Sequence, residues 1–92
     1  MIMQNDVGVI LKRMVELLRL GGADDWAAAL ENVRENFDED PVRMSSKLIS
    51  MYGGMGSLND IVLYGERKVL IAENNEFESL RERLYEICKG IK

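Results

Sequence analysis

The first part of the chain carries an apolar pattern with helical periodicity. Six apolar side chains recur at spacings of three and four residues: Val7, Ile10, Leu11, Met14, Leu17 and Leu18. This spacing places them on one face of an amphipathic helix. Asp6 is positioned to cap the start of this helix, and Gly21-Gly22 is expected to end it after Leu20.

A second apolar stripe follows a short break and predicts another helix. Its members are Trp26, Ala29, Leu30, Val33 and Phe37. Asp24 or Asp25 can cap the start, and the pattern continues to about residue 37. Asp38-Glu39-Asp40 then form a short acidic connection.

Asp40 followed by Pro41 predicts the start of a third helix. Proline lacks a backbone N–H and is accepted at the first helical position, and aspartate before it is a favoured N-cap. The stripe expected to be buried consists of Val42, Ser45, Leu48, Ile49 and Tyr52. Gly53-Gly54 is expected to end this helix.

Residues 53–60, with the sequence GGMGSLND, predict a turn-rich connection. Two apolar stretches rich in β-branched residues follow at 61–64 and 68–72, on either side of Gly65-Glu66-Arg67. This pattern predicts a short β-hairpin with a bulged or three-residue turn, and an irregular extended loop is the alternative. Because an isolated hairpin is marginally stable in water, it should lie against the helices.

A last apolar stripe predicts a helix that Asn74 or Asn75 would cap. Its members are Phe77, Leu80, Leu84, Ile87, Cys88 and Ile91. The predicted fold is mainly α, a four-helix domain with a small β-hairpin between the third and fourth helices. Its size fits a single domain over residues 1–92.

The charge balance limits the partners that the chain can bind. Sixteen acidic residues oppose twelve basic ones, which gives a net charge of −4, and there is no histidine. Nucleic acids and anionic lipids attract clustered Lys and Arg, so this composition argues against direct nucleic-acid and membrane binding. A basic protein partner matches better, although a modest negative charge also serves solubility.

Several features indicate a cytoplasmic protein. The N-terminal sequence MIMQNDVG lacks the basic stretch and apolar run of an export signal. No apolar run approaches the roughly 20 residues of a membrane span. The single cysteine, Cys88, excludes an internal disulfide and suits a reducing compartment.

The residues give little support for catalysis. Without histidine, the chain lacks the usual general base and the commonest metal ligand. Cys88 falls on an apolar stripe, where a buried small hydrophobe is the better interpretation. The glycine-rich loop lacks the lysine of a phosphate-binding loop, and the acidic connection lacks the spacing of a calcium loop. We expect no catalytic residues, metal or cofactor, although carboxylates from distant segments leave an enzymatic alternative.

The negative charge is concentrated in one segment. Residues 24–40 hold seven acidic residues and one base, a net charge of −6, whereas the rest of the chain is net +2. One interpretation is a solvated helix face, and the other is an acidic patch that steers a basic partner. The candidate docking residues are Glu31, Glu35, Asp38, Glu39 and Asp40.

The middle of the chain resembles a family of short, largely uncharacterised bacterial proteins. The resemblance is carried by GGMGSLND, by Asp25-Trp26, and by a tail that runs from Glu73-Asn74 to Leu84-Tyr85. It covers roughly residues 14–88, and GGMGSLND is its specific motif. The sequence departs from the family pattern at residues 65–68, so the turn is expected to differ in length and register.

Small acidic proteins of this kind resemble the immunity proteins of contact-dependent inhibition and polymorphic toxin systems. The resemblance implies that the chain neutralises a cognate toxin domain, such as a nuclease with a basic cleft. The glycine-rich loop would then give a second contact surface at Met55, Ser57, Asn59 and Asp60. The alternative is a structural or regulatory adaptor that dimerises through helices, with Ile2, Val9 or Val15 left exposed.

Overall fold

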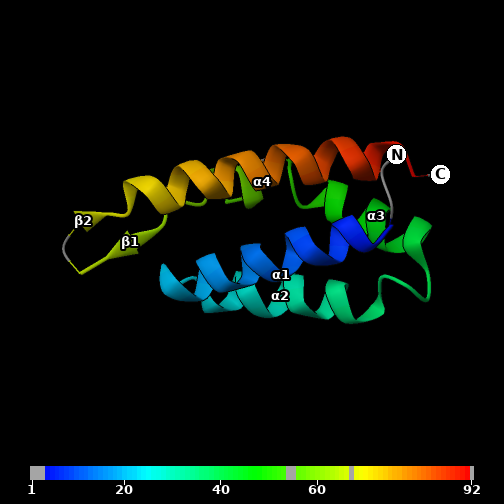
Figure 1. Cartoon of the computed structure of the whole chain (residues 1–92), viewed down its shortest axis with the longest axis horizontal. Coiled ribbons are helices and arrows are strands. Elements are labelled where there is room, and N and C mark those ends of the chain that lie inside the picture. Colours follow the sequence, from blue (N-terminus) through cyan, green and yellow to red (C-terminus); the bar gives the residue numbers. More distant parts are fainter. Residues whose placement is uncertain (1–3, 54–55, 67, 92) are drawn as a thin grey trace.

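The computed structural model describes residues 4–53, 56–66 and 68–91. Four α-helices account for most of this part of the chain: α1 (Gln4–Leu20), α2 (Asp24–Asn36), α3 (Pro41–Ser50) and α4 (Ile71–Lys89). A single 3-10 turn, η1 (Leu58–Asp60), and a hairpin of β1 (Tyr64–Gly65) and β2 (Lys68–Val69) lie between α3 and α4 (Figure 1). The predicted mainly α fold with an inserted hairpin is confirmed.

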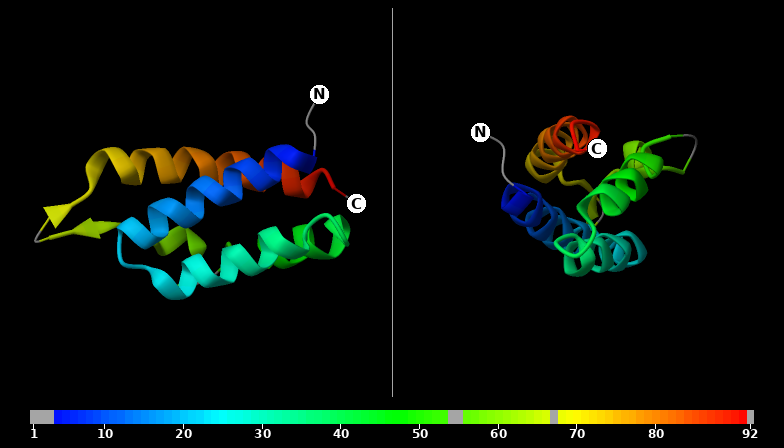
Figure 2. Two further views of the ribbon diagram at one scale, coloured as in Figure 1. Left: turned by 60° about the horizontal axis from the view of Figure 1, so that its bottom comes forward. Right: turned by 90° about the vertical axis from the view of Figure 1, so that its right-hand side faces the viewer.

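The helices form an elongated bundle of 41 × 25 × 20 Å. Helix α1 packs against both α2 and α4, and α3 packs against α4. The end-on view in Figure 2 shows the four helices arranged around a common core. The hairpin extends past the helices at one end, whereas the connection between α2 and α3 lies at the other end (Figure 1).

The apolar stripes of α1 and α4 form most of the core. All six predicted residues of α1 are at most 4% exposed. Phe77, Leu84, Ile87 and Cys88 of α4 are buried as predicted, and Leu80 and Ile91 pack against them at the edge. Each fully buried Leu or Phe contributes roughly 1.5–3 kcal/mol through removal of apolar surface from water.

The two middle helices are rotated slightly from the predicted orientation. In α2, Ala27 is fully buried, whereas Trp26 and Ala29 are only partly buried. In α3, Val42 was predicted to be buried but is 49% exposed, and Met44 is buried instead. The buried face of this helix consists of Met44, Ser45 and Leu48, and Val42 lies off that face.

Helix α1 ends at Leu20 ahead of Gly21-Gly22, as predicted, whereas only one of the predicted N-terminal caps is correct. Asp40 accepts a hydrogen bond at Oδ1 from the backbone N–H of Arg43 at 3.2 Å, and Pro41 follows at the first helical position. Helix α1 begins at Gln4 and α2 at Asp24, so Asp6, Asp24 and Asp25 lie inside first turns. Carboxylates there still interact favourably with the positive end of the helix dipole.

The hairpin is shorter than the sequence predicts. Tyr64 pairs with Val69 and Gly65 pairs with Lys68, so two positions connect the strands rather than three. Ile71 and Ala72 were assigned to the second strand but belong to α4, which begins three residues before Asn74. The predicted cap at Asn74 or Asn75 is therefore wrong.

Asn74 has a different structural role, because its side chain holds the base of the hairpin. Its Oδ1 accepts from the Leu63 N–H at 2.8 Å, and its Nδ2 donates to the carbonyl oxygens of Leu63 at 2.9 Å and Leu70 at 2.8 Å. Leu70 also donates its N–H to the Leu63 carbonyl oxygen at 3.1 Å. The side-chain amide thus satisfies both backbone groups of Leu63, which is completely buried.

We expect Asn74→Ala to destabilise the fold by about 2–3 kcal/mol, because it leaves the buried N–H of Leu63 without a partner. Asn75→Ala is the matched control, since Asn75 is an exposed neighbour in the same helix. Urea denaturation of the two variants measures the difference. Equal losses in both variants would contradict this role for Asn74.

A side-chain ion pair joins α1 to α4 on the surface. Arg13 donates from Nε and Nη2 to the two carboxylate oxygens of Glu76 at 2.6 and 2.9 Å. The hydrogen bonds from Arg13 hold the pKa of the Glu76 carboxyl below its usual value. A carboxyl group with a lowered pKa in the folded state stabilises the fold above its unfolded pKa, and this stabilisation is lost as the pH falls through the folded pKa.

We therefore expect Glu76→Gln to lower the free energy of unfolding at neutral pH. The difference in the free energy of unfolding between the wild type and the variant should narrow as the pH falls from the ordinary glutamate pKa of about 4.3 through the lowered pKa of folded Glu76. Glu78→Gln, at an exposed position on the same helix, is the matched control for the change of charge. Urea titrations between about pH 7 and about pH 3 provide the comparison. A gap that stays constant across this range would contradict the prediction.

Candidate partner-binding surfaces

The acidic segment forms one end of the molecule and part of the outer face of α2. Asp38, Glu39 and Asp40 make up the connection between α2 and α3, and all three are exposed (Figure 1). Glu35 is exposed on the last turn of α2. The structure therefore brings four of the five predicted acidic docking residues to one end of the bundle.

Glu31 differs from the other acidic candidates because it has a basic partner on its own helix. Arg34 donates from Nε to both carboxylate oxygens of Glu31 at 3.1 and 3.2 Å, and its Nη2 forms a further hydrogen bond. These hydrogen bonds lower the pKa of the Glu31 carboxyl. Within the described part of the chain, no ion pair forms at Glu35, Asp38 or Glu39. The charge available to a partner is thus greatest at the end of the bundle.

The polar side chains of the glycine-rich loop form hydrogen bonds within the loop and to Tyr52 just before it. Ser57 is 6% exposed and accepts at Oγ from the Asn59 N–H at 3.3 Å. The Asn59 side chain donates to the Tyr52 carbonyl oxygen at 2.7 Å, and Asp60 accepts from the Gly56 N–H at 2.7 Å. These local hydrogen bonds give Ser57, Asn59 and Asp60 a structural role, and docking through them stays a prediction. Met55 lies outside the described residues.

The backbone conformation of Gly56 explains why glycine is favoured at this position of the GGMGSLND motif. Its φ of +71° lies in the left-handed region, which most side chains disfavour. The hydrogen bond from its N–H to Asp60 closes the loop ahead of η1. The glycine and the aspartate of GGMGSLND therefore act together to shape this turn.

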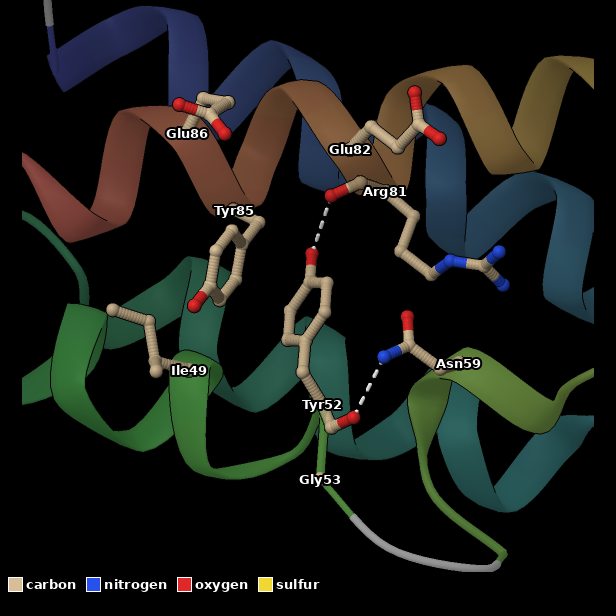
Figure 3. Close-up of a pocket in the computed structure, with 8 residues that line it drawn as sticks. All are labelled: Ile49, Tyr52, Gly53, Asn59, Arg81, Glu82, Tyr85 and Glu86. Carbon is tan, nitrogen blue, oxygen red and sulfur yellow. Dashed lines mark hydrogen bonds between the residues drawn. The ribbon is translucent and has the colours of Figure 1, made fainter.

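A groove of about 550 Å³ lies between the end of α3, the glycine-rich loop and α4 (Figure 3). Its lining consists of Ile49, Tyr52, Gly53, Asn59, Arg81, Glu82, Tyr85 and Glu86. Figure 3 shows the two tyrosine rings side by side, with the carboxylates of Glu82 and Glu86 directed away from Tyr52. The groove is thus mainly aromatic at its floor and acidic at one rim.

Tyr52 connects α3 to α4 across this groove. Its hydroxyl donates to the Arg81 carbonyl oxygen at 2.6 Å, and its ring lies 5.1 Å from the Tyr85 ring, centroid to centroid, with the planes tilted by 50°. Burial raises the pKa of the Tyr52 hydroxyl, so the hydroxyl keeps its proton and acts as a donor. Tilted aromatic pairs at this distance are favourable.

Arg81 holds the 3-10 turn against α4. Its Nη1 donates to the Leu58 carbonyl oxygen at 3.3 Å, and its guanidinium lies 5.9 Å from the centre of the Phe77 ring. Arg81, Glu82 and Glu86 lie between the apolar positions of α4, so helical periodicity alone gives no sign of their place beside the groove. Glu86 also forms an ion pair with Lys89 at 3.1 Å, within the last turns of α4.

Cys88 is 1% exposed, which agrees with its interpretation as a small buried hydrophobe. Burial raises the pKa of its thiol, and the thiol therefore stays protonated near neutral pH. Among the described residues, no group of three or more His, Cys, Asp or Glu side chains is arranged to hold a metal ion. Nor does any helix in residues 4–53, 56–66 and 68–91 have the length and apolar character needed to cross a membrane.

Comparison with known proteins gives a family and no named activity. The model of the family described as Domain of unknown function (DUF6966) matches residues 19–71, and the chain belongs to this family. The matched span runs from the end of α1 to the first residue of α4, and it contains α2, α3, the glycine-rich loop and the hairpin. No curated protein and no solved structure gives a significant match.

The two tyrosines of the groove should contribute unequally to stability, because only Tyr52 forms a hydrogen bond through its hydroxyl within the described residues. Tyr52→Phe removes the hydroxyl that donates to Arg81 and should cost about 1 kcal/mol of stability. Tyr85→Phe keeps the ring contact, and its hydroxyl has no hydrogen-bond partner within the described residues, so stability should change little. Urea denaturation distinguishes the two variants. Equal effects would show that the hydrogen bond from Tyr52 does not tie α3 to α4.

Proposed function

We propose that this protein is an immunity protein, which binds and neutralises a cognate bacterial toxin domain with a basic surface, such as a nuclease. The observation that carries this proposal is the cluster of exposed carboxylates at one end of the bundle. Glu35, Asp38 and Glu39 are exposed there, and the structure shows no ion pair at these three residues within its described part. A cluster of this kind gives a strong local potential for a basic partner.

The local geometry supports a docking role over simple solubility. Asp38, Glu39 and Asp40 are exposed in the connection between α2 and α3, at one end of the bundle, rather than on a long helix face (Figure 1). Like charges held close together disfavour the free protein slightly, and a basic partner would relieve this repulsion. Solubility alone is served equally well by charges spread over the surface.

The polar groups beside the groove also support a binding protein over an enzyme. The Tyr52 hydroxyl and the Arg81 guanidinium both donate to backbone carbonyl oxygens, which fixes α3 and η1 on α4. The thiol of Cys88 is buried with a raised pKa, which disfavours a thiolate nucleophile.

The alternative of an adaptor that dimerises through helices has less support. Of the three apolar residues that it would expose, Val15 is only 6% exposed and Ile2 lies outside the described residues. Val9 alone remains, at 69% exposure on α1. A single exposed valine is common on the surface of monomeric proteins.

The proposal predicts a complex with the product of the gene immediately upstream, formed on co-expression and stable through purification. It also predicts that this protein protects cells from that product. The double charge reversal Asp38→Lys with Glu39→Lys should weaken binding about tenfold or more, chiefly by slowing association. The difference in affinity between this variant and the wild type should be smaller at high salt, because screening removes the long-range attraction.

The matched control is Glu66→Lys with Glu78→Lys, two exposed acidic residues away from the acidic end. Both double variants carry the same net charge, so only the location of the change differs. Titration calorimetry and stopped-flow association rates measure the two effects. No complex and no protection would exclude the immunity function, and equal losses in the two variants would exclude the acidic end as the docking site.

A further inference from the structure

One polar side chain in the interior of the bundle lacks a hydrogen-bond partner. Ser45 of α3 is 1% exposed, and its Oγ is the one buried side-chain oxygen or nitrogen atom in the described part of the chain that forms no hydrogen bond. A hydroxyl in this state has lost its hydrogen bonds to water and has gained none in return, which disfavours the closed packing. It recovers those bonds only when α3 moves away from its neighbour.

The thiol of Cys88, on α4, lies opposite this hydroxyl and is also 1% exposed. Burial raises the pKa of the thiol, and the Ser45 hydroxyl lowers it in part, because it can donate to the thiolate. In the closed structure the two groups do not meet with hydrogen-bond geometry. A thiol is in any case a weak partner, so the pair does not repay the loss of water at Ser45.

Polar bonds between α3 and α4 are confined to the C-terminal end of α3. Tyr52, two residues after the helix, donates its hydroxyl to the Arg81 carbonyl oxygen at 2.6 Å and packs on the Tyr85 ring. Within α3 itself (residues 41–50), no side chain forms a hydrogen bond or an ion pair with α4. Tyr52 is therefore the latch that holds this helix in place, together with the apolar packing of Met44 and Leu48.

The remaining attachments of α3 are weak. It is the shortest of the four helices, with ten residues, and it packs mainly on α4 and much less on α2. The chain is exposed on both sides of it, at Asp38, Glu39 and Asp40 before the helix and at Gly53 after it. Elements of this kind open locally with a smaller free energy than global unfolding requires.

The groove described above lies where α3 and α4 already diverge. Ile49 and Tyr52 line it from the side of α3, and Tyr85 lines it from α4 (Figure 3). Cys88 follows Tyr85 by three residues on the same helix, about one turn further along. Movement of α3 away from α4 would therefore extend the groove as far as the thiol.

We propose that Cys88 is a gated thiol, which reacts with small disulfides when α3 opens from α4 as a local unit. In the open form the thiol loses its proton to water, and the thiolate sulfur attacks one sulfur of the disulfide. The S–S bond of the reagent breaks, a mixed disulfide forms at Cys88, and the other half leaves as a thiolate with the electron pair. Because the closed interior is densely packed, the added group keeps α3 displaced, so the modification changes the shape of the groove.

The rate at which dithiobis(nitrobenzoate) labels Cys88 tests the gate, and the absorbance of the released thionitrobenzoate measures it. The wild type should react more slowly than a peptide of residues 86–90, but faster than global unfolding allows. Tyr52→Phe weakens the latch and should raise the rate about fivefold. Asn74→Ala destabilises the fold at the base of the hairpin, away from the latch, and should leave the rate unchanged.

Two results of this comparison would overturn the proposal. If labelling required global unfolding, Asn74→Ala would raise the rate about thirtyfold or more. If the thiol became accessible through fraying of the last turn of α4, Tyr52→Phe would have no effect on the rate.

A pair of serine variants tests the unpartnered hydroxyl. Ser45→Ala removes it and should slow labelling at least about threefold relative to Ser46→Ala. Ser46 is the matched control, because it is the exposed neighbour in α3 and gains the same helix propensity from the change. Equal rates in the two variants would contradict a role for Ser45 in opening.

Hydrogen exchange in the wild type does not depend on the folding of any variant. The amides of Met44 and Leu48 in α3 should exchange through an opening of smaller free energy than those of Met14 and Leu18 in α1. Equal protection of the two helices would overturn the proposal. Labelling and exchange need no toxin, so the gate and the immunity function are tested separately.

Discussion

The contact between Leu63 and Asn74 is the constraint on which the arrangement of this chain depends. Leu63 is completely buried against the end of α1, and the side-chain amide of Asn74 satisfies both of its backbone groups. A buried backbone group without a partner is costly, so the chain before the hairpin can enter the core only where such an amide is present. Through Leu63 and Leu70, this contact joins the first turn of α4 to both chain segments at the base of the hairpin.

The parts of the fold that could be predicted from the sequence depend on residues that lie within a few positions of each other in the chain. Apolar periodicity identified the core faces of α1 and α4, and Asp40-Pro41 identified the start of α3 through a bond to Arg43 three residues away. The start of α4 could not be predicted, since Asn74 bonds to Leu63, eleven residues earlier. A local interpretation of Asn74 as a cap was reasonable, but a tertiary contact overrode it.

The same limit applies to the candidate surfaces. Composition located the acidic segment, but not which carboxylates have a basic partner, although the spacing of Glu31 and Arg34 is a recognisable helical pair. The turn in the glycine-rich loop could be predicted from the local sequence, because Asp60 and Asn59 form hydrogen bonds to backbone groups only a few residues away. The groove gave no such signal. It depends on Tyr52 meeting Arg81, 29 residues further along, and no periodicity links those positions.

The acidic connection and the hairpin lie at opposite ends of a molecule 41 Å long (Figure 1). Electrostatic attraction at the acidic end is screened over about 8–10 Å in physiological salt, so it does not reach the hairpin. Helix α1 spans most of the distance and is held to α4 by Arg13 and Glu76 and by a shared core. A charged partner bound at the acidic end would therefore leave the hairpin uncovered.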